Sequence, residues 1–174
     1  AQLFADPYNI VVLITDQERY ATHWPKGWVE KNLPTVARLK QHGLTYERAY
    51  TSACMCSPAR AVLMSSQFSP TNQIARSLQG ENSVQFPAKN VLLNIASMIE
   101  QHSDYEVLWK GKWHLSFAVD GFENWSEKDV SHMAETYDIN QWTPPDGGNA
   151  DIVTYKKNPK FALSTLGGGY ANND

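Results

Sequence analysis

Residues 56–60, Cys-Ser-Pro-Ala-Arg, combine a nucleophile, a helix start and a cation in one short stretch. Pro58 suits the first turn of a helix, where its missing N–H needs no partner, and residues 59–64 are mostly good helix formers. The unpaired N–H groups and the dipole of a helix start favour an anion beside Cys56. Arg60 lies about one turn further along and brings a positive fork to the same end. This stretch is therefore suited to binding and attacking an oxyanion.

Other interpretations of Cys56 have to be weighed against this one. A cysteine before a helix usually packs in a core. Cys54 and Cys56 are the only two cysteines of the chain. A zinc site needs more ligands at set spacings, and cysteines this close rarely form a disulfide without strain. The zinc and disulfide interpretations are therefore weak.

A second polar group follows an apolar run at residues 9–15. The run is largely β-branched and does not alternate, which predicts a strand buried on both faces of a parallel sheet. Ligands gather beyond the carboxyl ends of such strands. Asp16, followed by Gln17, therefore lies where a metal-binding carboxylate would be useful. A capping Asp in a turn is the structural alternative.

A third polar group follows a second candidate buried strand, at residues 105–109. Lys112 and His114 are two residues apart, so on an extended backbone their side chains would point the same way. In isolation Lys112 would be a solvated surface lysine, and His114 a polar residue satisfied beside the core. We expect Asp16, Cys56 and His114 to converge on one anion.

The elements expected around these groups indicate an α/β fold, with a mostly parallel sheet flanked by helices. Helices are predicted over 33–43, between Pro34 and Gly43, and over 91–99. Residues 44–50 alternate and predict a strand, whereas residues 69–90 are polar and resemble a loop. Residues 116–174 are predicted to be loop-rich.

Composition limits the kind of partner. The chain has 174 residues, 42% of them apolar, with 15 basic and 18 acidic residues and a net charge of −3. This is the composition of a globular protein, and it lacks the basic stripe of a nucleic-acid binder. No apolar run is long enough to span a membrane.

Two of these motifs resemble the signatures of the type I sulfatases, which belong to the alkaline phosphatase superfamily. They are Cys-Ser-Pro-Ala-Arg at 56–60 and Gly-Lys-Trp-His at 111–114. Asp16 matches the first member of the family's acidic metal-binding pair. Gln17 replaces the second, which is similar to the choline-sulfatase and phosphonate-monoester-hydrolase branch. Ser65-Ser66 stands where the family usually carries Thr-Gly.

The resemblance implies an alkaline-phosphatase-like fold and a catalytic residue made after translation. Cys56 would be converted to formylglycine, which hydrates to a geminal diol. One hydroxyl would attack the sulfur of a sulfate ester, and the other would later lose its proton and expel sulfate by C–O cleavage. Arg60 would steady the diol, Lys112 would bridge diol and sulfate, and His114 would bond the second hydroxyl.

The resemblance also implies one divalent cation, Ca²⁺ in the first place, with Mg²⁺ or Mn²⁺ as alternatives. Asp16, Gln17 and residue 56 would be its ligands in this chain. Replacing the second acid by Gln17 removes one negative charge, and carboxylate count helps to set the affinity for Ca²⁺.

The resemblance covers residues 9–115 and corresponds to the N-terminal part of a single sulfatase catalytic domain. We therefore interpret the chain, 1–174, as part of a longer enzyme whose remaining C-terminal half supplies further metal ligands. We expect this part alone to be inactive.

Three questions remain open at this level. The substrate is expected to be a small-molecule or carbohydrate sulfate ester, and four tryptophans would suit stacking on a sugar or aromatic ring as well as core packing: Trp24, Trp28, Trp113 and Trp142. A phosphonate monoester or phosphodiester hydrolase of the same superfamily is the first alternative, although Lys112 and His114 argue against it. A non-catalytic fragment or binding module is the second.

Overall fold

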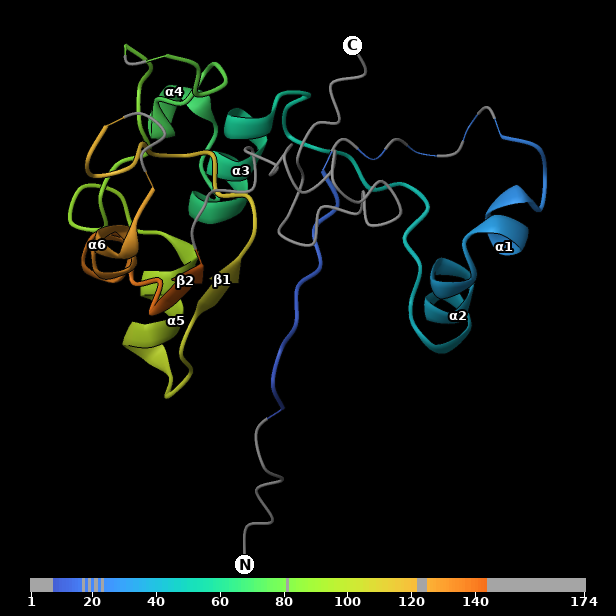
Figure 1. Ribbon diagram of the computed structural model, residues 1–174. Helices are drawn as coiled ribbons and strands as arrows, with labels where there is room; N and C mark the ends of the chain where they lie inside the picture. Colours follow the sequence, from blue (N-terminus) through green and yellow to red (C-terminus); the bar gives the residue numbers. More distant parts are fainter. Residues whose placement is uncertain are drawn as a thin grey trace, which may run out of the picture. The chain divides into compact units, whose positions relative to one another are not determined.

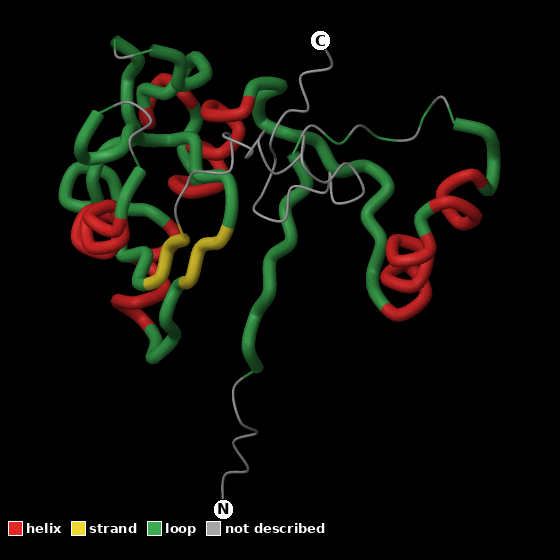
Figure 2. The backbone as a smooth tube through the Cα atoms, viewed as in Figure 1, coloured by secondary structure: helices red, strands yellow, loops and turns green. Residues whose placement is uncertain are grey.

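The computed structural model describes residues 8–16, 18, 20, 22, 24–80, 82–121 and 125–143. The chain divides into two compact units, Ala1–Ala49 and Tyr50–Asp174, each of which is considered by itself. Figures 1 and 2 show the helices and strands.

The described part of the first unit contains two short helices, α1 (Trp28–Asn32) and α2 (Pro34–His42). Helix α2 confirms the helix predicted over 33–43, with Pro34 as its first residue and Gly43 after its last. Gly43 has an extended backbone, so it does not use the left-handed conformation that glycine often adopts there. The ring of Trp24, ahead of α1, packs on that of Trp28, with the two ring centroids 4.2 Å apart.

The two strands predicted at 9–15 and 44–50 are wrong for this structure, because none of these residues lies in a strand. Four apolar residues of the first run, 10–13, are at least 71% exposed, and Leu44 is 79% exposed. A strand needs neighbouring strands to pair its backbone groups and a partner layer to cover its side chains. Helices are the only regular secondary structure among the described residues of this unit. Apolar composition is therefore not enough to form a strand.

The second unit is built on a two-stranded parallel sheet, β1 (Leu108–Lys110) and β2 (Gln141–Thr143). The strands lie side by side in Figure 2 and pair with Trp109 opposite Trp142. Parallel strands need a long crossover, and helix α6 (Glu127–Tyr137) lies on the connection between them. Strand β1 confirms the end of the strand predicted at 105–109, but it begins later and is not fully buried. The observed architecture is therefore helices with a small parallel sheet.

Three more helices complete the described part of this unit: α3 (Cys56–Ser65), α4 (Ser69–Asn72) and α5 (Ile95–His102). Helix α3 confirms the helix predicted after the cysteine motif. Helix α5 begins four residues later than expected, because the Asn94 side chain accepts hydrogen bonds from the N–H groups of Ala96 and Ser97. The predicted loop at 69–90 is interrupted by the single turn of α4.

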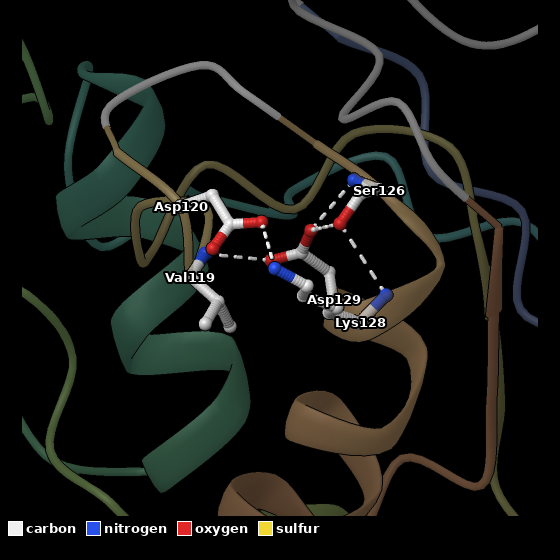
Figure 3. Close-up of polar contacts among 5 residues, drawn as sticks. All are labelled: Val119, Asp120, Ser126, Lys128 and Asp129. Atoms are coloured by element: carbon white, nitrogen blue, oxygen red, sulfur yellow. Dashed lines mark hydrogen bonds and ion pairs between the residues drawn. The ribbon is translucent and has the colours of Figure 1, made fainter.

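Helix α6 and strand β2 correct the prediction that residues 116–174 are loop-rich, as far as position 143. Figure 3 shows what begins the helix: Asp129 accepts hydrogen bonds from Ser126 N at 2.7 Å and from Val119 N at 2.8 Å. Ser126 is the N-cap residue of the helix, and its side chain accepts a hydrogen bond from the N–H of Lys128. This reciprocal box uses Asp where Glu or Gln is commoner, so its signature in the sequence is weak. The predictions for residues 144–174 lie outside the described residues.

The core of the second unit is aromatic and centres on Trp113, which is fully buried. Its ring contacts those of Trp109 at 5.4 Å and Tyr137 at 5.1 Å between centroids. Trp142 is also buried and packs on Trp125. Trp113 and Trp142 are therefore core residues, and the idea that they stack on a substrate ring is not supported by their positions.

Candidate functional site

The cysteine motif occupies the first turn of α3. Met55 precedes the helix with an extended backbone, so Cys56 is its first residue and Pro58 its third. The prediction placed the start at Pro58, two residues late. Pro58 is still within the first turn, where N–H groups have no acceptor inside the helix, so its missing N–H costs no hydrogen bond. Cys56 is half-buried, and neither Cys54 nor Cys56 forms a disulfide.

Arg60 connects this helix to the second motif. Its Nη1 donates a hydrogen bond of 2.6 Å to the main-chain oxygen of Lys112, and the side chain is only 8% exposed. The same oxygen accepts a bond of 3.1 Å from Trp109 Nε1. A buried guanidinium on a carbonyl oxygen is a strong, charge-assisted contact. The two motifs, far apart in the sequence, are thus adjacent in the folded unit.

Ser57 provides the second link between the motifs. Its Oγ donates to the main-chain oxygen of His114 at 2.7 Å and accepts from the N–H of Leu78 at 2.9 Å. The Nε2 atom of His114 lies 2.9 Å from the carbonyl oxygen of Leu78. Neither Ser57 nor Leu78 was singled out from the sequence. Leu78 acts through its backbone, which leaves no sequence signal, and Ser57 was quoted only as part of the motif without a role of its own.

The backbone is not extended at His114 or at Gly111, just before Lys112. His114 has a φ of 55° and Gly111 a φ of 87°, both in the left-handed region. The premise that Lys112 and His114 point the same way from an extended strand is therefore wrong. The chain turns as soon as it leaves β1, which brings the main chain at Lys112 and His114 to the start of α3. Lys112 is 6% exposed, so it is not the solvated lysine of the structural alternative.

The other two predicted site residues, Asp16 and Gln17, belong to the first unit. Asp16 is half-buried at a bend in the first unit, and Gln17 lies outside the described residues. Across the described ranges, no group of three or more His, Cys, Asp or Glu side chains could hold a metal ion. The structure thus brings together the segments of Cys56, Arg60, Lys112 and His114, and it leaves the convergence with Asp16 a prediction.

Tyr137 is a titratable residue within the aromatic core that includes Trp113. Burial raises the pKa of Tyr137 above its ordinary value of 10.0, and a hydrogen bond with Ser116 opposes this shift. Tyr137 also donates a hydrogen bond of 3.2 Å to the carbonyl oxygen of Phe86. This tyrosine is therefore a neutral structural group at ordinary pH.

Comparison with known proteins decides the family. The model of the family described as Sulfatase matches residues 8–167, which is most of the chain and includes both motifs. The chain belongs to the sulfatase family. The resemblance seen in the sequence is therefore confirmed.

Two curated sulfatases are similar to this chain at low identity. The N-acetylglucosamine-6-O-sulfatase of Bacteroides thetaiotaomicron is 25% identical over 154 residues, covering 85% of this chain and 26% of the relative. The ulvan-active sulfatase of Formosa agariphila is 24% identical over 165 residues, covering 89% of this chain and 30% of the relative. This sulfatase chain thus spans under a third of the length of either relative.

No solved structure matches the chain significantly. Among the described residues, none of the helices has the length and apolar character needed to cross a bilayer.

Proposed function

We propose that the protein hydrolyses sulfate monoesters through a formylglycine made from Cys56. The observation that carries this proposal is the bond from Arg60 to the carbonyl oxygen of Lys112, which joins the two sulfatase motifs. A sulfate ester is a dispersed anion with an alcohol leaving group. Its hydrolysis needs a nucleophile, positive charge around the sulfate oxygens and a proton for the leaving oxygen. The start of α3, with buried Arg60 and Lys112 close by in the fold, offers the first two.

The proposed reaction has two steps at residue 56. One hydroxyl of the hydrated aldehyde attacks sulfur, the S–O bond to the alcohol breaks, and the alcohol leaves with a proton. The second hydroxyl then loses its proton and the C–O bond to sulfate breaks. This releases sulfate and restores the aldehyde, which water hydrates again. Arg60 and Lys112 are proposed to hold negative charge, and His114 to bond the second hydroxyl.

The fold proposed for the whole enzyme is alkaline-phosphatase-like, with a larger parallel sheet than the two strands described. Helix α3 and strand β1 would contribute to it, together with the remaining C-terminal half. The activity proposed here is that of the whole enzyme, because this chain spans under a third of the length of either curated relative.

A divalent cation, Ca²⁺ in the first place, is proposed as cofactor with Asp16, Gln17 and residue 56 among its ligands. When bound, it would lower the pKa of the attacking hydroxyl and offset sulfate charge. Ca²⁺ takes about six to eight oxygen ligands, so these residues alone would not complete its shell. This part of the proposal rests on the family resemblance, and no reaction step above is derived through the ion.

The proposed substrate class is a sulfated carbohydrate. One relative is named for N-acetylglucosamine-6-O-sulfate and the other for ulvan. Both names support testing sulfated sugars ahead of other sulfate esters.

The test uses the full-length protein and a matched pair of cysteine variants. Mass spectrometry should find the Cys56 peptide lighter by the thiol-to-aldehyde conversion. The variant Cys56→Ala should lose aryl sulfatase activity, whereas Cys54→Ala should keep it, because Cys54 is exposed and lies before the helix. A wholly unconverted Cys56 in folded, inactive protein would overturn the proposal and favour a non-catalytic role. A much larger kcat/KM on an aryl phosphonate than on an aryl sulfate would favour the phosphonate hydrolase instead.

A further inference from the structure

A closed ring of three hydrogen bonds joins Ser57, Leu78 and His114. The Ser57 hydroxyl donates to His114 O at 2.7 Å, Leu78 N–H donates to Ser57 Oγ at 2.9 Å, and His114 Nε2 lies 2.9 Å from Leu78 O. Ser57 is 1% exposed and Leu78 5%, so water does not compete for these bonds. Leu78 and His114 each use two polar atoms in the ring, whereas Ser57 makes both of its bonds through one hydroxyl, so removing that hydroxyl loosens the other two residues.

The ring determines which nitrogen of His114 carries the proton in the neutral side chain. A carbonyl oxygen accepts hydrogen bonds and cannot donate, so the Nε2 atom facing Leu78 O must carry its hydrogen. In a neutral imidazole the lone pair is then on Nδ1. The partner of one ring nitrogen sets the role of the other, and here that partner is the backbone of Leu78.

The geometry points to Ser57 as a positioning residue that fixes the tautomer and orientation of His114, so that His114 acts on residue 56 through Nδ1. The second half of this statement rests on the proposed sulfatase function. Ser57 is suited to the task because it follows Cys56 directly in the first turn of α3. Its single hydroxyl therefore fixes the positions of Leu78 and His114 relative to residue 56.

The backbone at His114 supports this assignment. Its φ of 55° lies in the left-handed region, which is unfavourable for a residue with a Cβ. The Ser57 hydroxyl bonds the carbonyl oxygen of that same residue. The serine thus stabilises the unusual main-chain conformation of His114 directly and, through Leu78, the orientation of its imidazole. Without the hydroxyl, Leu78 N and His114 O each lose this partner, and the imidazole can rotate.

The experiment compares wild type, Ser57→Ala, Ser57→Thr and Ser65→Ala in the full-length protein. Ser65 is the matched control, because it is a buried serine on the same helix whose hydroxyl bonds Ala61 O at 2.6 Å, away from the ring. Nitrogen-15 NMR of labelled histidine, assigned with a His114→Gln variant, reports the tautomer and the exchange of the Nε2 proton. Steady-state assays with an aryl sulfate give kcat and KM.

In the wild type we expect the Nε2–H tautomer with a slowly exchanging proton. In Ser57→Ala that exchange should accelerate, and kcat should fall by about tenfold to a hundredfold while KM changes by less than about twofold, as for a misoriented catalytic group. Ser57→Thr should restore slow exchange and most of kcat. Ser65→Ala should match the wild type in both measurements.

An Nδ1–H tautomer in the wild type would overturn the inference, and that measurement needs no variant to fold. Unchanged Nε2–H exchange in folded Ser57→Ala would overturn it as well. Failure of the proposed function is recognised separately: a wild type without sulfatase activity refutes that function, while the tautomer and its dependence on Ser57 are still measured by NMR.

Discussion

The guanidinium of Arg60 donates a hydrogen bond of 2.6 Å to the main-chain oxygen of Lys112 inside the second unit of the protein. The contact joins helix α3, which begins at Cys56, to the turn after strand β1. Because Arg60 is buried, the contact has consequences for stability as well as for the proposed chemistry.

Replacing Arg60 tests this link. Arg60→Ala should lower the free energy of unfolding by about 1–3 kcal/mol, since a buried charge-assisted hydrogen bond is lost. Arg60→Lys should recover little of it, because an ammonium group does not reproduce the planar fork of arginine. Urea denaturation measures both changes. Arg76→Ala, at an exposed arginine, is the control and should shift stability by less than about 0.5 kcal/mol. Equal effects at both arginines would mean that the contact contributes nothing specific.

Asp129 is expected to be the main anchor of α6. It is fully buried and accepts bonds from the N–H groups of Val119 and Ser126. Asp129→Ala should cost about 2–3 kcal/mol, because charged hydrogen bonds and half of a capping box are lost together. Thermal unfolding followed by circular dichroism measures this. Glu127→Gln, an exposed acid in the same turn, should change the melting temperature little. If the two variants melt alike, the hydrogen bonds of Asp129 drawn in Figure 3 do not stabilise the helix.

Tyr137 should make the protein less stable in alkali. Burial raises its pKa in the folded state above 10.0, whereas the unfolded chain ionises near the ordinary value. Between these two pKa values the folded state binds more protons than the unfolded state, so the free energy of unfolding falls as the pH rises through that window. Below pH 10 the contribution is fully present. Tyr137→Phe should flatten the decline, and urea titrations at several pH values from neutral to strongly alkaline measure its slope. An unchanged slope would assign the alkaline loss to other groups.

Removing divalent cations from the full-length protein should abolish sulfatase activity if the proposed cofactor is needed. Activity should return on adding Ca²⁺ and, less fully, Mg²⁺ or Mn²⁺. Asp16→Asn should raise the Ca²⁺ concentration needed for half-recovery by about tenfold or more, because one carboxylate ligand is lost. Glu18→Gln, at an exposed neighbour, should not. Full activity in a chelator would exclude an exchangeable cation.

Some of the fold could be predicted from local sequence signals. Helices α2 and α3 form where Pro34, Pro58 and the helix-forming residues indicated them, because helix boundaries depend on neighbours within a turn. Helix α6 was missed because its capping box has Asp129 at the third position, where Glu or Gln is commoner. The strands predicted at 9–15 and 44–50 did not form, because a strand depends on partners elsewhere in the chain.

What the sequence by itself determined about this protein is its family, since the residue types and order of two short motifs are sufficient to recognise a sulfatase. What only the tertiary structure decided is how those motifs meet, with Arg60 on the backbone of Lys112 and Ser57 between Leu78 and His114. The physical reason is that these bonds involve carbonyl and N–H groups, which every residue type shares. A backbone partner leaves no trace in the sequence until the chain folds and brings it within reach.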